Sequence, residues 1–389
     1  MKKRFLALLL AGMMAVSLAA CGGSADTDPG EDTSEPTEEI SGIPADQLKL
    51  GLILEGDDAD DTCSRDHIKG LRQACEALGI DYASQVEVRT GVGADASCTD
   101  VINELTEDGC QAIFAGSFDH EPYIIEAASR YPDVQFFHAS GYQCATDNLD
   151  NTHNYFAKIY QARYLSGIVA GLKTETNKLG YVAAKPFAEV ISGFTAFYLG
   201  AKSVNPGVTM LVSYTNEWSD ADQEAVTAQA LIDQGCDVIS HHTNTTAPVL
   251  TAETNGVSAV GYNSDALSAA PGAVLVSAMI NWGSYYEHAL DCLIRGEAIE
   301  QDWCGDYSEG SCCLSPFNED IIAPGTREAV ETAADGIADG SVQVFAGPLH
   351  CIDADGHELN LARGEAYIEN ETSSAPAFAF IVDGITVLP

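Results

Sequence analysis

Apolar residues along positions 155–240 repeat with two alternating spacings. One set recurs at the spacing of a helix: Phe156, Ile159, Tyr160, Tyr164, Ile168 and Leu172. A short apolar run at 179–183, closed by Pro186, predicts a buried strand. A second helical set around 194–201 and a second strand at 210–214 follow. Helices that alternate with buried strands predict a parallel sheet covered on both faces, with ligands bound beyond the carboxyl ends of its strands.

The same alternation continues on both sides of this stretch. Further strands are expected at 48–54, 85–89, 110–115, 134–139, 236–241, 259–262 and 274–279, with helices at 68–78, 99–105, 122–130 and 285–294. After the first 47 residues, roughly 340 remain, which is large for one hydrophobic core. We therefore expect two lobes, 48–150 with about 283–310, and 151–282 with about 311–389. The chain should cross between them near 140–154, 281–286 and 295–317.

The first 47 residues predict an exported protein that is anchored to the membrane by lipid. Positions 1–21 have a basic start and an apolar stretch too short for a stable membrane span. They end in Leu-Ala-Ala-Cys, which resembles a bacterial lipobox, so cleavage before Cys21 would leave its thiol to carry lipid. The alternative is an ordinary secretory signal with an incidental cysteine. Residues 22–47 are acidic and poor in apolar groups, which predicts a disordered, extended tether.

Charge and motif content exclude several classes of function. The formal net charge of −40 argues against binding to nucleic acid or to anionic lipid by charge. The histidines lack the spacing of a zinc site, and GxSxG, HExxH and P-loop motifs are absent, so we expect no metal, no cofactor and no enzymatic activity. Of twelve cysteines, Cys21 is assigned to lipid; the other eleven show no CxxC spacing, and their disulfide state stays open.

The run from Arg163 to Asp220 carries a specific resemblance to a known family. Its segments YLSG with AG, NKLGYV, GF with LGAKSVNP, and an aromatic two residues before an Asp resemble the basic-membrane-protein family, the PnrA-like solute-binding lipoproteins of bacterial ABC importers. A weaker resemblance extends from about 48 to 305. It implies an α/β, two-lobed, type I periplasmic-binding-protein-like fold, each lobe a doubly wound parallel sheet, with the ligand cleft between the lobes. It also implies a purine nucleoside as ligand and an ABC permease as partner; we expect a monomer.

The resemblance assigns ligand contacts to loops that follow strands. In the first such loop, Asp60 matches a family Asp, whereas Cys63 and Ser64 stand where the family has an aromatic and an Asn. An alternative alignment places Asp58 at the family Asp. Asp58, Asp60 or Asp61 could instead cap the following helix, and one carboxylate can do both.

Later loops supply the other expected contacts: Ser140, Trp218, Thr243, Asn244, Asn263, Asp265, Asn281 and Trp282. Trp218 falls where the family has an aromatic that stacks on the base, although a lone loop tryptophan is more often a packing residue. Ser140 and Asn263 each replace a family Asp and bring no charge. Asn281 and Trp282 stand near a family Lys that is missing, and Trp282 could equally pack in the hinge.

These features predict the substrate-binding lipoprotein of an ABC importer, which holds a purine nucleoside or related planar heterocycle between its lobes. Because several contact positions differ from the family, a free base, a sugar, a sulfur-containing compound or a modified nucleoside also fits. Two other classes compete. A lipid-anchored surface hydrolase would need a nucleophile beside a base, or a metal. A solute-sensing receptor would use the same fold to pass a signal to a membrane partner.

Overall fold

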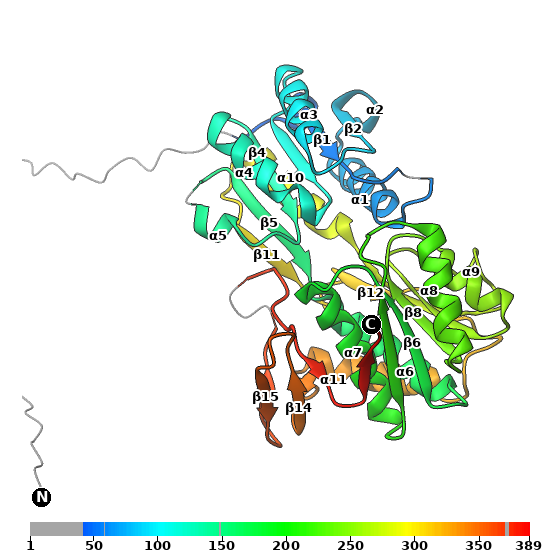
Figure 1. Ribbon diagram of the computed structural model, residues 1–389. Coiled ribbons are helices and arrows are strands. Elements are labelled where there is room, and N and C mark those ends of the chain that lie inside the picture. The colour runs from blue at the N-terminus through cyan, green and yellow to red at the C-terminus, as the bar shows by residue number, and fades with distance from the viewer. Residues whose placement is uncertain (1–41, 58, 148, 370–372) are drawn as a thin grey trace, which may run out of the picture. The chain divides into compact units, whose positions relative to one another are not determined.

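Two β-sheets covered by helices make up the computed structural model, which describes residues 42–57, 59–147, 149–369 and 373–389 (Figure 1). All of these belong to one unit, Ile40–Pro389. The expected signal segment at 1–21, with the lipid-bearing Cys21, and most of the tether lie outside the described residues, as does Asp58. Across the described ranges, no helix combines the length and the hydropathy needed to cross a membrane.

The first sheet has six parallel strands in the order β11-β5-β4-β3-β1-β2. They are β1 (Leu50–Ile53), β2 (Val86–Arg89), β3 (Ala112–Ala115), β4 (Gln135–Ala139), β5 (Thr152–Ala157) and β11 (Asp302–Gly305). Its helices are α1 (Thr62–Leu78), α2 (Tyr82–Gln85), α3 (Ala96–Glu107), η2 (Phe118–His120), α4 (Glu121–Arg130), α5 (Cys144–Asp147) and α10 (Trp282–Arg295). Leu50 and Leu52 pack into one core and Ile53 into another, because successive side chains point to opposite faces of a strand. Both faces are therefore buried, which explains the continuous apolar runs.

The second sheet repeats this plan in the order β12-β10-β9-β8-β6-β7-β18. Its strands are β6 (Lys178–Ala183), β7 (Thr209–Tyr214), β8 (Val238–His242), β9 (Ser258–Tyr262), β10 (Val274–Ile280), β12 (Cys312–Leu314) and β18 (Ile385–Val387), of which β12 alone pairs antiparallel. Its helices are α6 (Ile159–Lys173), α7 (Ala188–Val204), α8 (Ala221–Asp233), α9 (Ala247–Thr254) and α11 (Thr326–Ala338). The predicted α/β architecture of two doubly wound lobes is thus confirmed, with one antiparallel edge strand.

The chain passes between the two sheets three times: at Lys158, at Asn281 and along 306–311. The last two passages fall within or beside the predicted ranges. The first does not, because β5 pairs with β4 in the first sheet, so the lobe boundary expected at 150/151 lies after Ala157. Phe156, expected in a helix, lies in β5, and the helix begins at Ile159. An apolar strand that runs straight into an apolar helix leaves no polar break for the pattern to detect.

Residues 42–47, expected in the disordered tether, are instead packed against the first lobe. The backbone N–H of Ile43 donates to the carbonyl of Leu293 at 3.0 Å, and a short 3-10 helix, η1 (Ala45–Gln47), follows. Ile43 and Ala45 contact the core that contains Leu290. The expected end of the tether at residue 47 was therefore too late. The acidic, proline-containing composition of this stretch hides the few apolar residues that pack against the lobe.

The C-terminal residues, for which the sequence carried no family resemblance, complete the second lobe. Short strands β13 (Phe345–Ala346) and β16 (Ala366–Tyr367) form one pair, and β14 (Leu349–Ile352), β15 (Glu358–Leu361) and β17 (Ile381–Val382) form another sheet. Figure 1 shows β14 and β15 beside α11. Phe345 and Phe378 stack at 4.1 Å in the same core as α6 and α7, and β18 extends the main sheet at β7. This part of the chain therefore supports the lobe rather than forming a separate domain.

Candidate functional site

A cavity of about 330 Å³ lies where loops from both sheets meet. Five neighbouring strands of each lobe share one spatial order: β2-β1-β3-β4-β5 in the first lobe and β7-β6-β8-β9-β10 in the second. The strand order therefore reverses beside β1 and beside β6, and ligands bind at such switch points in folds of this kind. Segments after β1, β3 and β4 line the cavity from the first lobe. Segments after β6, β7, β8 and β9 line it from the second, and the crossing at 280–282 closes one side.

Aromatic rings form much of the wall: Phe118, Phe156, Trp218, Tyr262 and Trp282. Trp282 is held rigidly, because His67 stacks on it with ring centroids 4.1 Å apart and the rings inclined by 20°. His67 is in turn bound through Nδ1 to the hydroxyl of Tyr286 at 2.6 Å. Flat, fixed aromatic faces of this kind suit a planar ligand.

Six carboxylates also line the cavity: Glu55, Asp57, Asp60, Asp61, Glu189 and Glu217. Among the described residues, no lysine or arginine lines it. Glu55 accepts from the Ser117 hydroxyl at 2.6 Å, and burial raises the pKa of Asp61 although bonds from Ser64, Ser219 and Asn244 oppose the shift. The cavity therefore disfavours anions and offers many hydrogen-bond acceptors.

Direct contacts join the two lobes around the cavity. The indole Nε1 of Trp218 donates to Oδ2 of Asp119 at 3.0 Å, and the Lys185 ammonium lies 2.6 Å from the same oxygen. The amide of Thr62 donates to the carbonyl of Asn244 at 2.7 Å. The hydroxyl of Ser264 donates to Asp66 at 2.7 Å. The structure thus represents a closed arrangement of the lobes.

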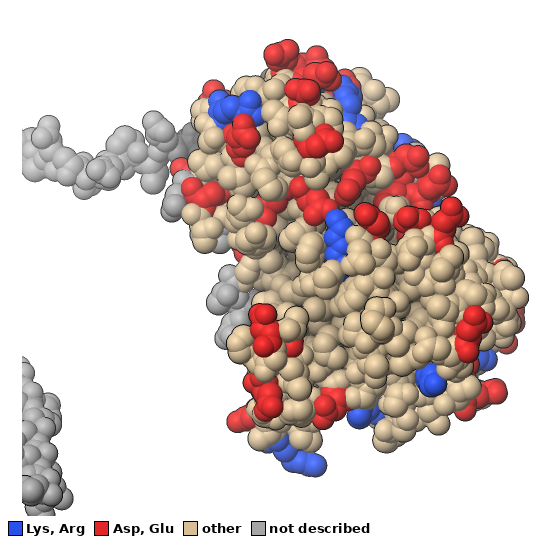
Figure 2. Space-filling model, in the orientation of Figure 1, with Lys and Arg blue, Asp and Glu red and all other residues tan. Residues whose placement is uncertain are grey.

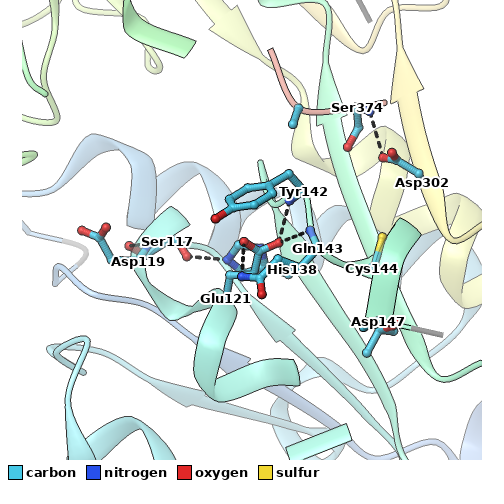
Figure 3. A network of polar contacts seen from close by, with 12 residues as sticks. Ser117, Asp119, Glu121, His138, Tyr142, Gln143, Cys144, Asp147, Asp302 and Ser374 are labelled. Atoms are coloured by element: carbon cyan, nitrogen blue, oxygen red, sulfur yellow. Dashed lines mark hydrogen bonds and ion pairs between the residues drawn. The ribbon is translucent and has the colours of Figure 1, made fainter. Parts of the chain in front are cut away.

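Two buried side chains of the first lobe, Glu121 and His138, hold the loops after β3 and β4 in place (Figure 3). Glu121 accepts hydrogen bonds from the backbone amides of Tyr142 and Gln143 at 2.5 and 2.7 Å, and Nε2 of His138 bonds the carbonyl of Ser117 at 2.8 Å. A Cβ on Gly141 would overlap both His138 and Glu121, so only glycine fits there. This framework keeps Ser140 at a φ of 58°, an uncommon conformation for a residue other than glycine.

Eight of the predicted site residues line the cavity: Asp60, Cys63, Ser64, Ser140, Trp218, Asn244, Asn263 and Trp282. Their contact with a ligand stays a prediction. The N-cap of α1 is Asp61, which accepts from the Ser64 amide at 2.7 Å, so Asp60 is not the helix cap. Asp60 lies exposed at the rim.

Three predicted residues point elsewhere. The hydroxyl of Thr243 is fully buried and donates to Glu224 at 2.8 Å. Asp265 is exposed and accepts from the Leu267 amide, and Asn281 donates to the carbonyl of Gly310 in the hinge. Each stands within two positions of a residue that does line the cavity, and nearby positions in a loop point in different directions. Alignment to a loop therefore found the segment but not always the side chain.

Several lining residues were missed, among them Glu189, His242 and Tyr262. His242 and Tyr262 are the last residues of β8 and β9, so the rule that ligands lie at strand carboxyl ends could have found them. Glu189 lies in the first turn of α7, where an acidic residue is expected simply from the helix dipole. No local signal distinguished it.

Other polar groups of the described residues form no comparable site. The eleven cysteines among them are free thiols, eight of them buried. Asp353, Asp355 and His357 lie close enough to share a cation, but they sit in the exposed turn between β14 and β15, where Asp353 already accepts from the backbone and ring of His357. Exposed acidic turns of this kind are common without a metal.

Comparisons with known proteins agree with this architecture. A family model described as "ABC transporter substrate-binding protein PnrA-like" matches residues 47–306. A purine-binding protein from Brucella abortus is 32% identical over 303 residues, which cover 78% of this chain and 84% of the relative. A protein from Haloferax volcanii, named as a candidate ABC transporter glucose-binding protein, is 29% identical over 305 residues, 78% and 76% of the two chains.

Solved structures share the fold at low sequence identity. An ABC transporter solute-binding protein from Aeropyrum pernix K1 superposes with a TM-score of 0.66 at 17% identity, covering 77% of this chain and 94% of the other. A solute-binding protein from Conexibacter woesei gives 0.62 at 20% identity, covering 76% and 98%. At these identities the likeness concerns the fold alone.

Proposed function

Because this chain belongs to the PnrA-like family of ABC transporter substrate-binding proteins, we propose that it captures a purine base or nucleoside between its lobes and delivers it to a membrane permease. The observation that carries the proposal is the lining of the cavity, in which flat aromatic rings alternate with carboxylates and carboxamides. Purines offer a flat face to the rings and N–H groups to the acceptors.

The charge of the cavity restricts the ligand further. With six carboxylates and, among the described residues, no lining lysine or arginine, the cavity would repel a phosphate or carboxylate group. The exposed face in Figure 2 likewise carries many more acidic than basic side chains. The proposed ligand is therefore uncharged or cationic, which excludes nucleotides.

The size of the cavity points to one small molecule. Its volume of about 330 Å³ is near the lower end for ligand sites, which span roughly 300–1,000 Å³. A single base or nucleoside suits this volume better than a larger solute. A monosaccharide would also fit by size, and the Haloferax volcanii relative makes glucose a necessary comparison. The five aromatic rings that line the cavity favour a planar heterocycle over a sugar, because each ring offers a surface on which a base can stack.

Isothermal titration calorimetry of the purified protein tests the proposal. The panel is guanosine, inosine, adenine and hypoxanthine, with guanosine 5′-monophosphate and glucose as comparison solutes. We expect at least one uncharged purine to bind, and the nucleotide to bind about 100-fold more weakly than its nucleoside because like charges in a closed site are costly. Preference for glucose or for the nucleotide would contradict the proposed ligand class.

The location of the protein follows from the same family. We propose that Cys21, outside the described residues, carries the lipid that anchors the chain on the outer side of the cytoplasmic membrane. The acidic residues after Cys21 would hold the lobes away from the anionic surface by charge repulsion. We further propose that the protein acts as a monomer, without catalysis, and presents its closed lobes to the permease.

A further inference from the structure

Arg163 of α6 is a fully buried cation without an ion pair among the described residues. Its Nη1 donates to the carbonyl of His241 at 2.9 Å, and its guanidinium carbon lies 3.6 Å from the centroid of the Tyr262 ring. Its Nε and Nη2 have no hydrogen-bond partner in the part of the chain that the structure describes. A buried charge is costly unless nearby groups compensate it, so this arginine needs an explanation.

His242 lines the cavity and lies near Arg163. Its Nε2 is 3.3 Å from a carboxylate oxygen of Glu189, while its Nδ1 is buried and has no hydrogen-bond partner within the described ranges. A Cβ placed on Gly193 would lie 3.0 Å from Nδ1 of His242 and 3.8 Å from Nε of Arg163. The two unpaired nitrogens therefore border the same small space beside Gly193, and a water there could join them.

This arrangement selects one tautomer of His242. Burial and the charge of Arg163 lower the pKa of His242 well below its usual value, so the ring is neutral and carries a proton on one nitrogen. Arginine can only donate, so a water that accepts from its Nε and donates to Nδ1 would favour the tautomer in which Nδ1 is the acceptor. The proton is then on Nε2, which donates to Glu189. Arg163 thus acts on Glu189 through His242, whose N–H it helps to orient toward the carboxylate in the cavity wall.

Glu189 is surrounded by groups from both lobes. Ser140, after β4, donates a side-chain hydrogen bond to it, and His242 donates from β8. The other titratable or charged groups near it are Asp119 of η2, Arg163 of α6, Cys63 of α1 and Tyr262 of β9. A carboxylate accepts about four hydrogen bonds, so acceptor positions remain for a ligand.

We propose that Glu189, oriented by His242 and Arg163, is the carboxylate that determines the specificity of the cavity. It accepts hydrogen bonds from N–H groups of the ligand and so selects ligands that present such donors to it. The inference rests on the proposed purine ligand and deepens it: purines that present a lactam N–H or an amino group here bind, and analogues methylated at those nitrogens do not. Glu189 touches the ligand, whereas Arg163 is a positioning residue that acts through His242.

Because Glu189 can be protonated, the inference predicts a specific dependence of ligand affinity on pH. Burial raises the pKa of Glu189 to about 7, with Arg163 opposing the rise and Asp119 adding to it. A donor ligand needs the ionised carboxylate, so its affinity should fall by about tenfold per pH unit below pH 7 and level off above it. At pH 6.5 binding should release protons, which appears as a dependence of the calorimetric heat on the ionisation heat of the buffer.

The test is calorimetric titration between pH 5.5 and 8.5 with guanosine, inosine, adenine and hypoxanthine. The donor-blocked probe is 1-methylinosine, whose base has neither a lactam N–H nor an amino group. We expect Glu189→Gln to lower affinity at pH 8 by about 10- to 100-fold and to abolish the pH dependence, because a charge-assisted bond is lost. The matched control is Glu287→Gln, an exposed acid on α10, which should keep the wild-type profile. Arg163→Lys should retain binding with a shifted pH midpoint, an effect that a purely structural role would not cause.

The outcomes separate the two claims. If the wild-type protein binds no purine at any pH, the proposed function fails and this inference fails with it. If the wild-type protein binds a purine but Glu189→Gln matches it in affinity and pH profile, the proposed function stands and this inference is overturned. Binding of 1-methylinosine as tight as that of inosine, in a protein that binds inosine, would also overturn it.

Discussion

The indole Nε1 of Trp218 donates a 3.0 Å hydrogen bond to Oδ2 of Asp119, so a ring that lines the cavity from the second lobe is tied directly to the first lobe. Lys185 binds the same carboxylate oxygen and lies 5.4 Å from the centroid of the Trp218 ring. The contact that joins the two lobes thus also holds the Trp218 ring in place in this closed arrangement. A ligand that contacts Trp218 stabilises the closed form only as far as it binds that form better.

Asp119→Ala should weaken ligand binding without destabilising the ligand-free protein. The change removes the acceptor shared by Trp218 and Lys185, at a site where the two charged side chains are about one-fifth to one-quarter exposed (20% and 24%). We expect a loss of about 1–2 kcal/mol in binding free energy, or roughly tenfold in affinity. Calorimetry with the tightest purine of the panel measures it. Asp133→Ala, an exposed acid of the same lobe, is the control; equal affinity for both variants would argue against the interlobe contact.

Gly167→Ala should destabilise the second lobe strongly. Helices α6 and α7 pack so closely that a Cβ on Gly167 would overlap the carbonyl oxygen of Phe197, a backbone atom that cannot rotate away. Overpacking of this kind costs about 1–3 kcal/mol or more, which should lower Tm by several degrees. Gly207→Ala is the matched control, since its Cβ would find only one side-chain atom, at 3.6 Å. Thermal unfolding curves measure the difference in Tm between the two variants. Similar Tm values would mean that α6 and α7 can move apart at little cost.

Glu369→Gln should cost more thermal stability at acid than at alkaline pH. Glu369 is buried, accepts from the amides of Ala377 and Phe378 at 3.1 and 2.9 Å, and has a pKa raised by burial from 4.5 to about 7. The folded state thus holds this proton more tightly than the unfolded state, and the stability it contributes is lost as pH rises through 7. Gln stays neutral at both pH values, but its NH2 group faces one of the two amide donors. We therefore expect a lower Tm than wild type at pH 5, by a margin that narrows by roughly 1–3 °C at pH 8.

The control for this comparison is Glu358→Gln on the exposed edge of β15. It should change Tm by less than about 1 °C at either pH, because surface substitutions away from such features have small effects. A difference in Tm between wild type and Glu369→Gln that is equal at the two pH values, or larger at pH 8, would contradict the raised pKa of Glu369.

The sheets were predictable because their strands are short, buried on both faces and separated by helical patterns. Leu50, Leu52 and Ile53 show why: all three are apolar although they face two different cores. The pattern failed at Phe156, where strand β5 runs into α6 without a polar break. It also could not place the C-terminal strand β18 beside β7, a parallel pairing across more than 170 positions that no local signal encodes.

The cavity was only partly predictable from the sequence. Trp218 and Asn244 were found because the family resemblance assigns ligand contacts to the loops after β7 and β8. Glu189, His242 and Arg163 could not be found this way. Their relationship depends on a helix, a strand end and a second helix that meet only in the folded lobe. The same holds for Asp119, which reaches Trp218 across the two lobes.

Cys21→Ala tests the proposed anchor. If the sequence Leu-Ala-Ala-Cys is a lipobox, the variant should remain unprocessed or be released from the membrane fraction, because only the cysteine thiol can carry the lipid. Cell fractionation and the mass of the purified N-terminus measure both effects. Cys75→Ala, a buried thiol in the first lobe, controls for cysteine loss as such and should stay in the membrane fraction. Normal processing with membrane retention of the Cys21 variant would exclude the lipobox.

The central claim is that Trp218 forms the aromatic wall on which a planar ligand stacks between the lobes. Calorimetric titration of Trp218→Ala with the tightest purine of the panel, beside its ligand-free melting curve, tests this most directly. We predict a loss of about 1–3 kcal/mol, roughly tenfold to a hundredfold or more in affinity, with nearly unchanged melting. Trp303→Ala, whose ring packs 5.1 Å from Tyr285 and does not line the cavity, should show the reverse. Unchanged affinity with a large loss of stability in Trp218→Ala would contradict the account, because Trp218 would then be a packing residue.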